Sequence, residues 1–138
     1  MPDANQNLRG YLSEDFRLFH LRDNGIQPVE FHYHTFHKIM VLLSGHVSYA
    51  IEGKSYTLEP GDIVLVSCGC LHRPLVSDKL PYERIILYIS PAFLRSLSSP
   101  TCQLETCFLR AKKEFSFVLR PGEHLDALLR TLASLKLL

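Results

Sequence analysis

The chain has 138 residues, a length that suits a single domain built around one hydrophobic core. Hydrophobic residues make up 46% and charged residues 21%, and no apolar run approaches the ~18 residues that a spanning helix needs, which excludes a disordered chain and a helical membrane protein. The 15 Lys and Arg against 14 Asp and Glu give a net charge of +1 without a long basic run, which argues against a nucleic-acid-binding surface within this chain.

The N-terminal segment MPDANQNLRGYLSEDF is polar and mixed in charge. It lacks the basic region and apolar stretch of a secretory signal, so we expect a cytoplasmic protein. The cysteine spacing indicates no disulfide framework, and free thiols agree with a reducing compartment.

Residues 1–90 are predicted to form an N-terminal arm and a barrel of short strands. Turn residues recur along this part of the chain, as at Asp23 to Gly25, at Ser44 and Gly45, at Glu52 to Lys54 and at Pro60 to Asp62. Short antiparallel strands in two Greek keys form a closed jelly roll, which protects the sheet edges. The predicted strands are Phe16–Leu21, Val29–His34, Lys38–Leu43, His46–Ile51, Ser55–Leu58, Ile63–Val66, His72–Val76 and Tyr82–Ser90.

Residues 91–138 are predicted to be mostly helical. Ser90 and Pro91 are typical of a helix start, and 114–119 is predicted to return as a strand. The run from Glu123 to Leu138 carries leucines at 125, 128, 129, 132, 135 and 138, which form an apolar stripe on a helix. This helix either packs on the barrel, pairs with a second copy in a homodimer, or does both, and its open end favours a further domain beyond it.

Histidines give the clearest functional pattern. His32 and His34 are two residues apart in a predicted strand, so their side chains leave it on one face, and Lys38 has the same parity. His72 can meet this pair if its strand is a neighbour. His37 has the opposite parity and is expected to face outward. The other histidines, at positions 20, 46 and 124, are expected to be ordinary.

The spacing around these histidines resembles the two motifs of the cupin superfamily. The segment HYHTFHKIMVLLSG matches the first motif, and GDIVLVSCGCLH matches the second with Ser67 in place of a proline. The resemblance implies a mainly β, cupin-type double-stranded β-helix, a jelly-roll barrel, followed here by C-terminal α-helices. Two positions depart from it: the metal-binding Glu falls on Lys38, and an expected Asn falls on Val76.

A narrower resemblance is to the N-terminal sensor domains of AraC-type transcription regulators. The segments FHYHTFHKI, YAIEGKSYTLEPGDIVLV and LHRP carry it, over about residues 16–95. It implies that the barrel binds a small effector, that the C-terminal helix dimerises or transmits the signal, and that DNA is bound by helix-turn-helix units absent from this chain. It also implies that the chain is not an enzyme.

The predicted ligand-binding residues are His32, His34, Lys38 and His72. Lys38 favours an anionic effector or a sugar over a metal, because an ammonium beside three imidazoles repels a divalent cation. Alternatively, the stem of Lys38 packs inside while its amine reaches the barrel mouth. Five further residues are candidates for lining the cavity or for the core: Phe36, Met40, Tyr49, Ile86 and Tyr88. Tyr82 and Arg84 are weaker candidates for reaching a ligand.

The alternative function is a small metal-dependent cupin enzyme, an isomerase or a dioxygenase. In that case His32, His34 and His72 hold a divalent metal such as zinc, and no further cofactor is implied. The carboxylate-to-lysine change at position 38 argues against it.

Overall fold

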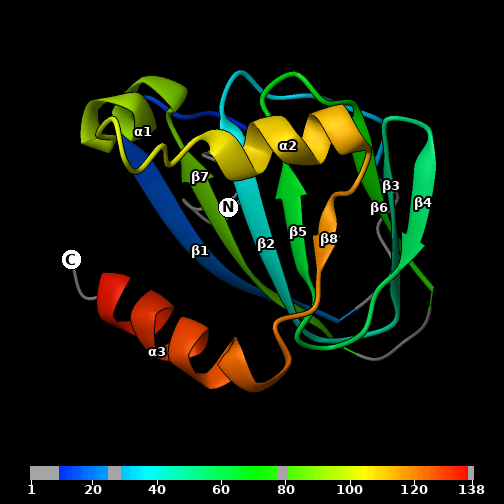
Figure 1. The fold of residues 1–138 in the computed structure, drawn as a ribbon. Helices are drawn as coiled ribbons and strands as arrows, with labels where there is room; N and C mark the ends of the chain where they lie inside the picture. Colours follow the sequence, from blue (N-terminus) through cyan, green and yellow to red (C-terminus); the bar gives the residue numbers. More distant parts are fainter. Residues whose placement is uncertain (1–9, 25–28, 78–80, 137–138) are drawn as a thin grey trace.

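Two antiparallel sheets form the body of the protein (Figure 1). The computed structural model describes residues 10–24, 29–77 and 81–136. In chain order the elements are β1 (Phe16–Asp23), β2 (His37–Ser44), β3 (Val47–Ile51), β4 (Lys54–Thr57), β5 (Ile63–Val66), β6 (His72–Val76), β7 (Tyr82–Ile89), α1 (Pro91–Leu97), α2 (Thr106–Glu114), β8 (Val118–Leu119), η2 (Gly122–His124) and α3 (Leu125–Leu135).

The larger sheet has the strand order β1-β7-β2-β5-β8, and the smaller sheet has the order β4-β3-β6. Strand β7 alternates buried and half-buried residues along its length, as a strand does when one face covers the interior. The β3–β4 hairpin turns at Glu52 and Gly53, both with positive φ, which is the geometry of a tight turn that matches strand twist. The expected mainly β jelly roll with C-terminal helices is confirmed.

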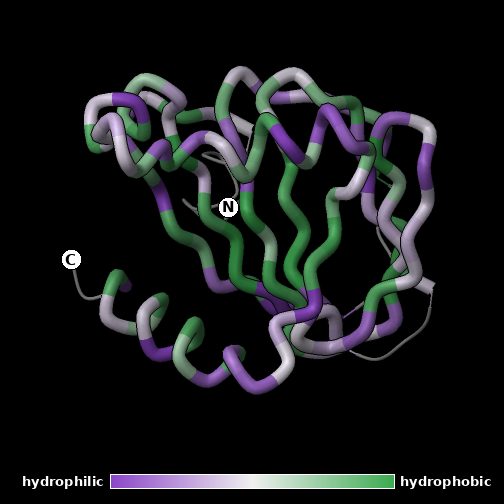
Figure 2. Tube along the Cα trace, viewed as in Figure 1, coloured by the Kyte–Doolittle hydropathy of each residue, from purple (hydrophilic) through white to green (hydrophobic). Residues whose placement is uncertain are grey.

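The hydrophobic core lies between the two sheets. The central strands β2, β5 and β7 carry the longest apolar runs, and they stand out as continuous hydrophobic traces in Figure 2. Met40, Leu42, Tyr49, Ile51 and Val64 are fully buried there. Burying such side chains contributes ~1.5–3 kcal/mol each, so this core holds the sheets face to face.

The helices lie outside the sheets. Helix α1 begins as expected: the Ser90 hydroxyl accepts a hydrogen bond from the Phe93 amide at 3.3 Å, and Pro91 follows in the first turn. Helix α2 places Phe108 and Ala111 in the core cluster, and β8 then joins the larger sheet beside β5. Among the described residues, no helix has the length and apolarity needed to cross a membrane.

The strand predicted at Val29–His34 is wrong. The alternation is real, since Phe31 and Tyr33 are exposed while His34 is buried, but only His32 pairs, in a single bridge to His72. The segment meets the edge of β6 at that one residue and then continues into β2. The alternation of exposed and buried residues is therefore present here, but no neighbouring strand forms a ladder of backbone hydrogen bonds with the segment.

Two other boundaries differ from expectation. The predicted strand over 114–119 is reduced to Val118–Leu119, because Glu114 ends α2 and Phe115 takes the left-handed conformation that terminates it. The predicted helix from Glu123 to Leu138 divides into the 3-10 turn η2 and α3. Gly25, assigned to a turn, and Leu138, the last of the leucine stripe, lie outside the described residues.

Candidate functional site

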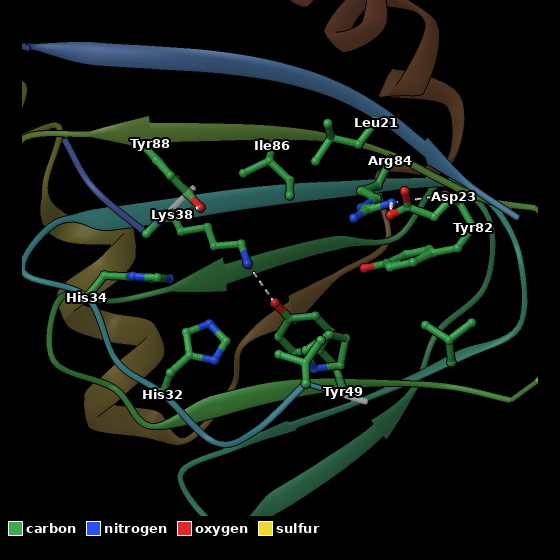
Figure 3. A pocket seen from close by; sticks show the side chains of 14 residues that line it. Leu21, Asp23, His32, His34, Lys38, Tyr49, Tyr82, Arg84, Ile86 and Tyr88 are labelled. Carbon is green, nitrogen blue, oxygen red and sulfur yellow. Dashed lines mark hydrogen bonds and ion pairs between the residues drawn. The ribbon is translucent and has the colours of Figure 1, made fainter. Parts of the chain in front are cut away.

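A cavity of about 300 Å³ opens between the two sheets (Figure 3). Its walls come from β1, β2, β3, β6 and β7 together with the segment before β2. The described residues that line it are Gly10, Leu21, Asp23, Val29, His32, His34, Lys38, Tyr49, Pro74, Val76, Tyr82, Arg84, Ile86 and Tyr88. In Figure 3 the Lys38 amine meets the Tyr49 hydroxyl below Ile86, with His32 and His34 on one side and Asp23, Tyr82 and Arg84 on the other.

Strand parity explains which residues reach this cavity. On β7 every second residue faces inward, which presents Tyr82, Arg84, Ile86 and Tyr88 along one wall. Lys38 pairs with Tyr88 in the register of β2 and β7, so it lies at the same end of the cavity as that tyrosine. The order of residues along β7 therefore becomes the order of groups along the cavity.

Three histidines form a cluster at the Lys38 end. His32 and His72 exchange two backbone hydrogen bonds of 3.1 and 2.9 Å across their bridge. The His72 ring centroid lies 4.2 Å from that of His32 and 5.1 Å from that of His34, and the His32 and His34 centroids are 4.9 Å apart. His72 is fully buried behind the other two and does not itself line the cavity.

Backbone carbonyls fix two of these rings. The Nδ1 of His32 donates to the Glu30 carbonyl and the Nδ1 of His72 donates to the Cys70 carbonyl, each at 2.9 Å. Each Nε2 is thereby left with a lone pair to offer. Among the described residues, the buried Nε2 atoms of His34 and His72 have no hydrogen-bond partner.

Two of the three imidazoles, those of His34 and His72, are uncharged. Burial, and then the nearby Lys38 ammonium, lower the pKa of His34 to about 3, and the same two causes lower the pKa of His72 to about 3. Both imidazoles are therefore neutral near pH 7. They act as hydrogen-bond acceptors or metal ligands rather than as cations.

Lys38 is buried at 7% exposure and donates a 3.0 Å hydrogen bond to the hydroxyl of Tyr49. Burial raises the pKa of Tyr49, so this partner stays neutral. The ammonium also lies near the face of the Tyr49 ring, 5.7 Å from its centroid. These contacts place a positive charge inside the cavity, not at its mouth as the alternative view of Lys38 expected.

The sequence identified one end of this cavity clearly, and at the other end it gave Tyr82 and Arg84 only as weaker candidates, both of which line the cavity. It singled out His32, His34, Lys38 and His72, which the structure brings together, and Tyr49, Ile86 and Tyr88, which line the wall. The other two candidates, Phe36 and Met40, belong to the core. Arg84 and Asp23 form the opposite end. The inward parity of Arg84 was the available signal, and Asp23 gave none because it lay in an expected turn.

His37 faces away from the cavity, as its parity predicts, but it is not exposed to solvent. It lies on the outer face of the larger sheet, but α2 covers it and leaves only 2% exposed. Its Nε2 donates to Glu105 at 2.7 Å, its Nδ1 accepts from the Cys68 amide at 2.9 Å, and its ring stacks on Phe108 with centroids 4.2 Å apart. Strand parity gave the correct face, but it could not show what covers that face.

One protein-family model covers most of the chain. Residues 16–136 match the family model of the AraC-like ligand-binding domain. The chain belongs to this family. Comparison with curated proteins finds no significant match.

Solved structures share the cupin barrel of this AraC-like domain. A cupin 2 conserved barrel domain protein from Salinispora arenicola aligns at 14% identity and TM-score 0.51, over 70% of this chain and 76% of that one. A conserved protein of unknown function from Streptococcus pyogenes gives 15% and 0.52, over 59% and 69%. ToxT from Vibrio cholerae gives 19% and 0.50, over 61% and 34%. At such identities the likeness concerns the fold.

The three clustered histidines of this AraC-like domain match part of the metal site of the cupin motif. One ligand atom from each of His32, His34 and His72 lies within 4.8 Å of the others, and two of the three residues have an unpartnered, buried Nε2. Three such nitrogens fit a divalent ion such as zinc. The fourth ligand of the motif, a carboxylate, is replaced by Lys38, so the site has no anionic donor from that position.

Proposed function

We propose that this domain binds a small organic acid in the cavity between its sheets and serves as the sensing part of a transcription regulator. The observation that carries the proposal is the buried Lys38 ammonium, which donates to the neutral Tyr49 hydroxyl. The described lining residues contain two basic side chains, Lys38 and Arg84, against a single acidic one, Asp23. A buried positive charge is stabilised by an anion that lies within hydrogen-bond distance of it.

The chemistry of the wall indicates the size and kind of ligand. Leu21, Ile86 and Val76 give the cavity an apolar wall, and an apolar pocket with a few placed polar groups is typical of small-molecule sites. Val76 stands where the cupin motif has an asparagine, which extends the apolar surface. The structure of ToxT holds a butenoic acid derivative, a carboxylic acid, and this supports the same ligand class here.

Sensing requires that ligand binding favour one arrangement of the longer protein over another. Strand β2 connects the cavity to helix α2, because Lys38 faces the ligand while the ring of the adjacent His37 stacks on Phe108 of α2. In this proposal DNA is bound by domains outside this chain. The half-buried leucines of α3, among them Leu128 and Leu135, pair two copies of the regulator.

Binding of simple acids to the purified domain tests the proposal. We expect straight-chain monocarboxylates such as hexanoate to raise the unfolding temperature and to bind measurably by calorimetry. Lys38→Met should weaken that binding by about tenfold or more, since a hydrogen-bonded charge contributes ~1.5–3 kcal/mol. The matched control is Lys113→Met, which removes an exposed lysine of α2. Equal binding by Lys38→Met, or binding of neutral sugars alone, would contradict the proposal.

The histidine cluster supports a second candidate, a metal-dependent cupin enzyme such as an isomerase or dioxygenase. The observation that favours it is that the buried Nε2 atoms of His34 and His72 have no hydrogen-bond partner within the described part of the chain. In that case His32, His34 and His72 would hold the ion, which would act as a Lewis acid toward a substrate oxygen. Elemental analysis of protein purified without a metal-binding tag decides between the two. One metal per chain that disappears in His34→Ala would favour the enzyme.

A further inference from the structure

Arg84 forms a second polar end of the cavity. The side chain is 6% exposed and lies over the ring of Tyr82, with its guanidinium carbon 4.0 Å from the centroid. Its Nη1 donates to Asp23 Oδ2 at 2.7 Å and to the Tyr82 carbonyl at 3.1 Å. The buried Nε has no hydrogen-bond partner among the described residues. An unpaired buried donor of this kind costs ~1–3 kcal/mol, which a ligand acceptor would recover.

The strand register sets the distance between the two polar ends. Lys38 pairs with Tyr88, and Leu42 pairs with Arg84, so the two basic residues stand four positions apart along the paired strands. At ~3.3 Å per residue, their backbones are separated by roughly 13 Å. The Lys38 side chain extends along the cavity toward Tyr49, and Ile86 lies between the two ends (Figure 3). A short, extended ligand can therefore contact both ends.

The Arg84 end of the cavity already holds an acidic group. Arg84 is paired with the carboxylate of Asp23, with 2.7 Å between Nη1 and Oδ2. A second ligand carboxylate beside Arg84 would be repelled by Asp23, whose side chain is 41% exposed. A hydroxyl or primary amide meets both needs, because its oxygen accepts from Arg84 Nε while its hydrogen is donated to Asp23.

We infer that the effector is a short acid whose far end carries a neutral group that both donates and accepts hydrogen bonds, as in an ω-hydroxy acid. The carboxylate lies at Lys38, the apolar chain passes Ile86, and the terminal hydroxyl bridges Arg84 and Asp23. This inference rests on the proposed function, since it describes the other end of the same ligand.

Calorimetry with matched acids tests the inference on the intact chain. The probes are straight-chain acids of four to eight carbons, each as the plain acid, the ω-hydroxy acid and the dicarboxylate. At the best chain length we expect the hydroxy acid to bind about tenfold more tightly than the plain acid, and more tightly than the dicarboxylate. If the plain acid binds as well as the hydroxy acid, or if the dicarboxylate binds best, the inference is wrong.

Two variants assign the effect to the correct side chains. Arg84→Met should remove the advantage of the hydroxyl while leaving the plain acid bound. Asp23→Asn should reverse the preference in favour of the dicarboxylate, because Arg84 then lacks its counter-charge. Arg22→Met is the matched control, since Arg22 is an exposed arginine on the same strand as Asp23. An unchanged preference in both Arg84→Met and Asp23→Asn overturns the inference.

The outcomes separate this inference from the proposed function. If acids bind and depend on Lys38 but show no preference at the far end, only the inference fails. If no acid of the series binds, both fail together.

Discussion

At the scale of single residues, the adjacent residues His37 and Lys38 of β2 face opposite sides of the larger sheet. Lys38 faces the cavity, and His37 faces the underside of α2, where Glu105, Cys68 and Phe108 contact it. The Nδ1 of His37 accepts from a backbone amide, so its Nε2 carries the proton that is donated to Glu105. The imidazole is therefore held neutral by burial and by the Cys68 amide, while Glu105 opposes them.

This residue makes the stability of the domain sensitive to acid. Burial lowers the pKa of His37, against an opposing effect of Glu105, so the unfolded chain takes up a proton near pH 6.5 that the folded chain refuses. The contribution of His37 to stability is thus present above that pH and falls as the pH drops below it. The pKa of Glu105 is lowered chiefly by its hydrogen bond to His37, so its own contribution is lost only at more acid pH.

We expect His37→Gln to reduce this acid sensitivity. Glutamine retains a donor for Glu105 and an acceptor for the Cys68 amide, but it does not titrate. Urea unfolding at pH 7.5 and pH 5.5 should show a loss of stability that is smaller in the variant by about 1 kcal/mol. The exposed His124 provides the control substitution His124→Gln. Identical pH dependence in wild type and His37→Gln would refute the assignment.

At the scale of elements, α2 is the least predictable part of the fold and one of its important supports. The helix buries Phe108 at 2% exposure against the outer face of the larger sheet, and the Ser67 hydroxyl donates to the Phe108 carbonyl. Ser67 occupies the position where the cupin motif has a proline, so this departure from the motif anchors the helix. The loop that follows α2 is held as well, because Lys54 and Tyr56 both donate to the Phe115 carbonyl at 3.0 Å.

The contribution of α2 can be measured with two neighbouring residues. Phe108→Ala should lower the free energy of unfolding by ~3–5 kcal/mol, because it empties a buried site between the helix and His37. Leu109→Ala, one residue along the same helix and 55% exposed, should change it by less than about 1 kcal/mol. Denaturant unfolding of both variants provides the comparison. Equal losses would mean that α2 does not cover the sheet in the way described.

At the scale of the whole molecule, helix α3 buries only part of its apolar stripe against the barrel. Leu132 is buried, and Leu125 reaches within 3.0 Å of the position that a side chain at Gly61 would take. The other described leucines of the stripe are half-buried. A groove of about 240 Å³ remains between the helix and the sheet, lined by Leu18, His20, Leu43, Ile85, Leu129, Leu132, Ala133 and Lys136. The barrel alone therefore uses only part of the stripe.

The proposed pairing of two copies through α3 can be tested by sedimentation velocity over a range of concentrations. We expect the wild type to dimerise and Leu128→Glu to sediment as a monomer, since a charge on the half-buried stripe opposes burial against a second copy. Thr131→Glu, on the exposed side of α3, is the matched control and should still dimerise. Circular dichroism establishes that each variant is folded. A wild type that remains monomeric at every concentration would contradict the pairing.

The sequence alone determined the strand pattern of the barrel and one end of the cavity. Alternation along a strand is a local property, so it placed His32, His34 and Lys38 on one face and identified seven of the expected strands correctly. Only the tertiary structure decided what each face meets. It buried His37 under α2, reduced Val29–His34 to one bridge, and brought Asp23 to Arg84 across 61 positions of the chain. These outcomes depend on contacts between distant segments, which no local period in the sequence records.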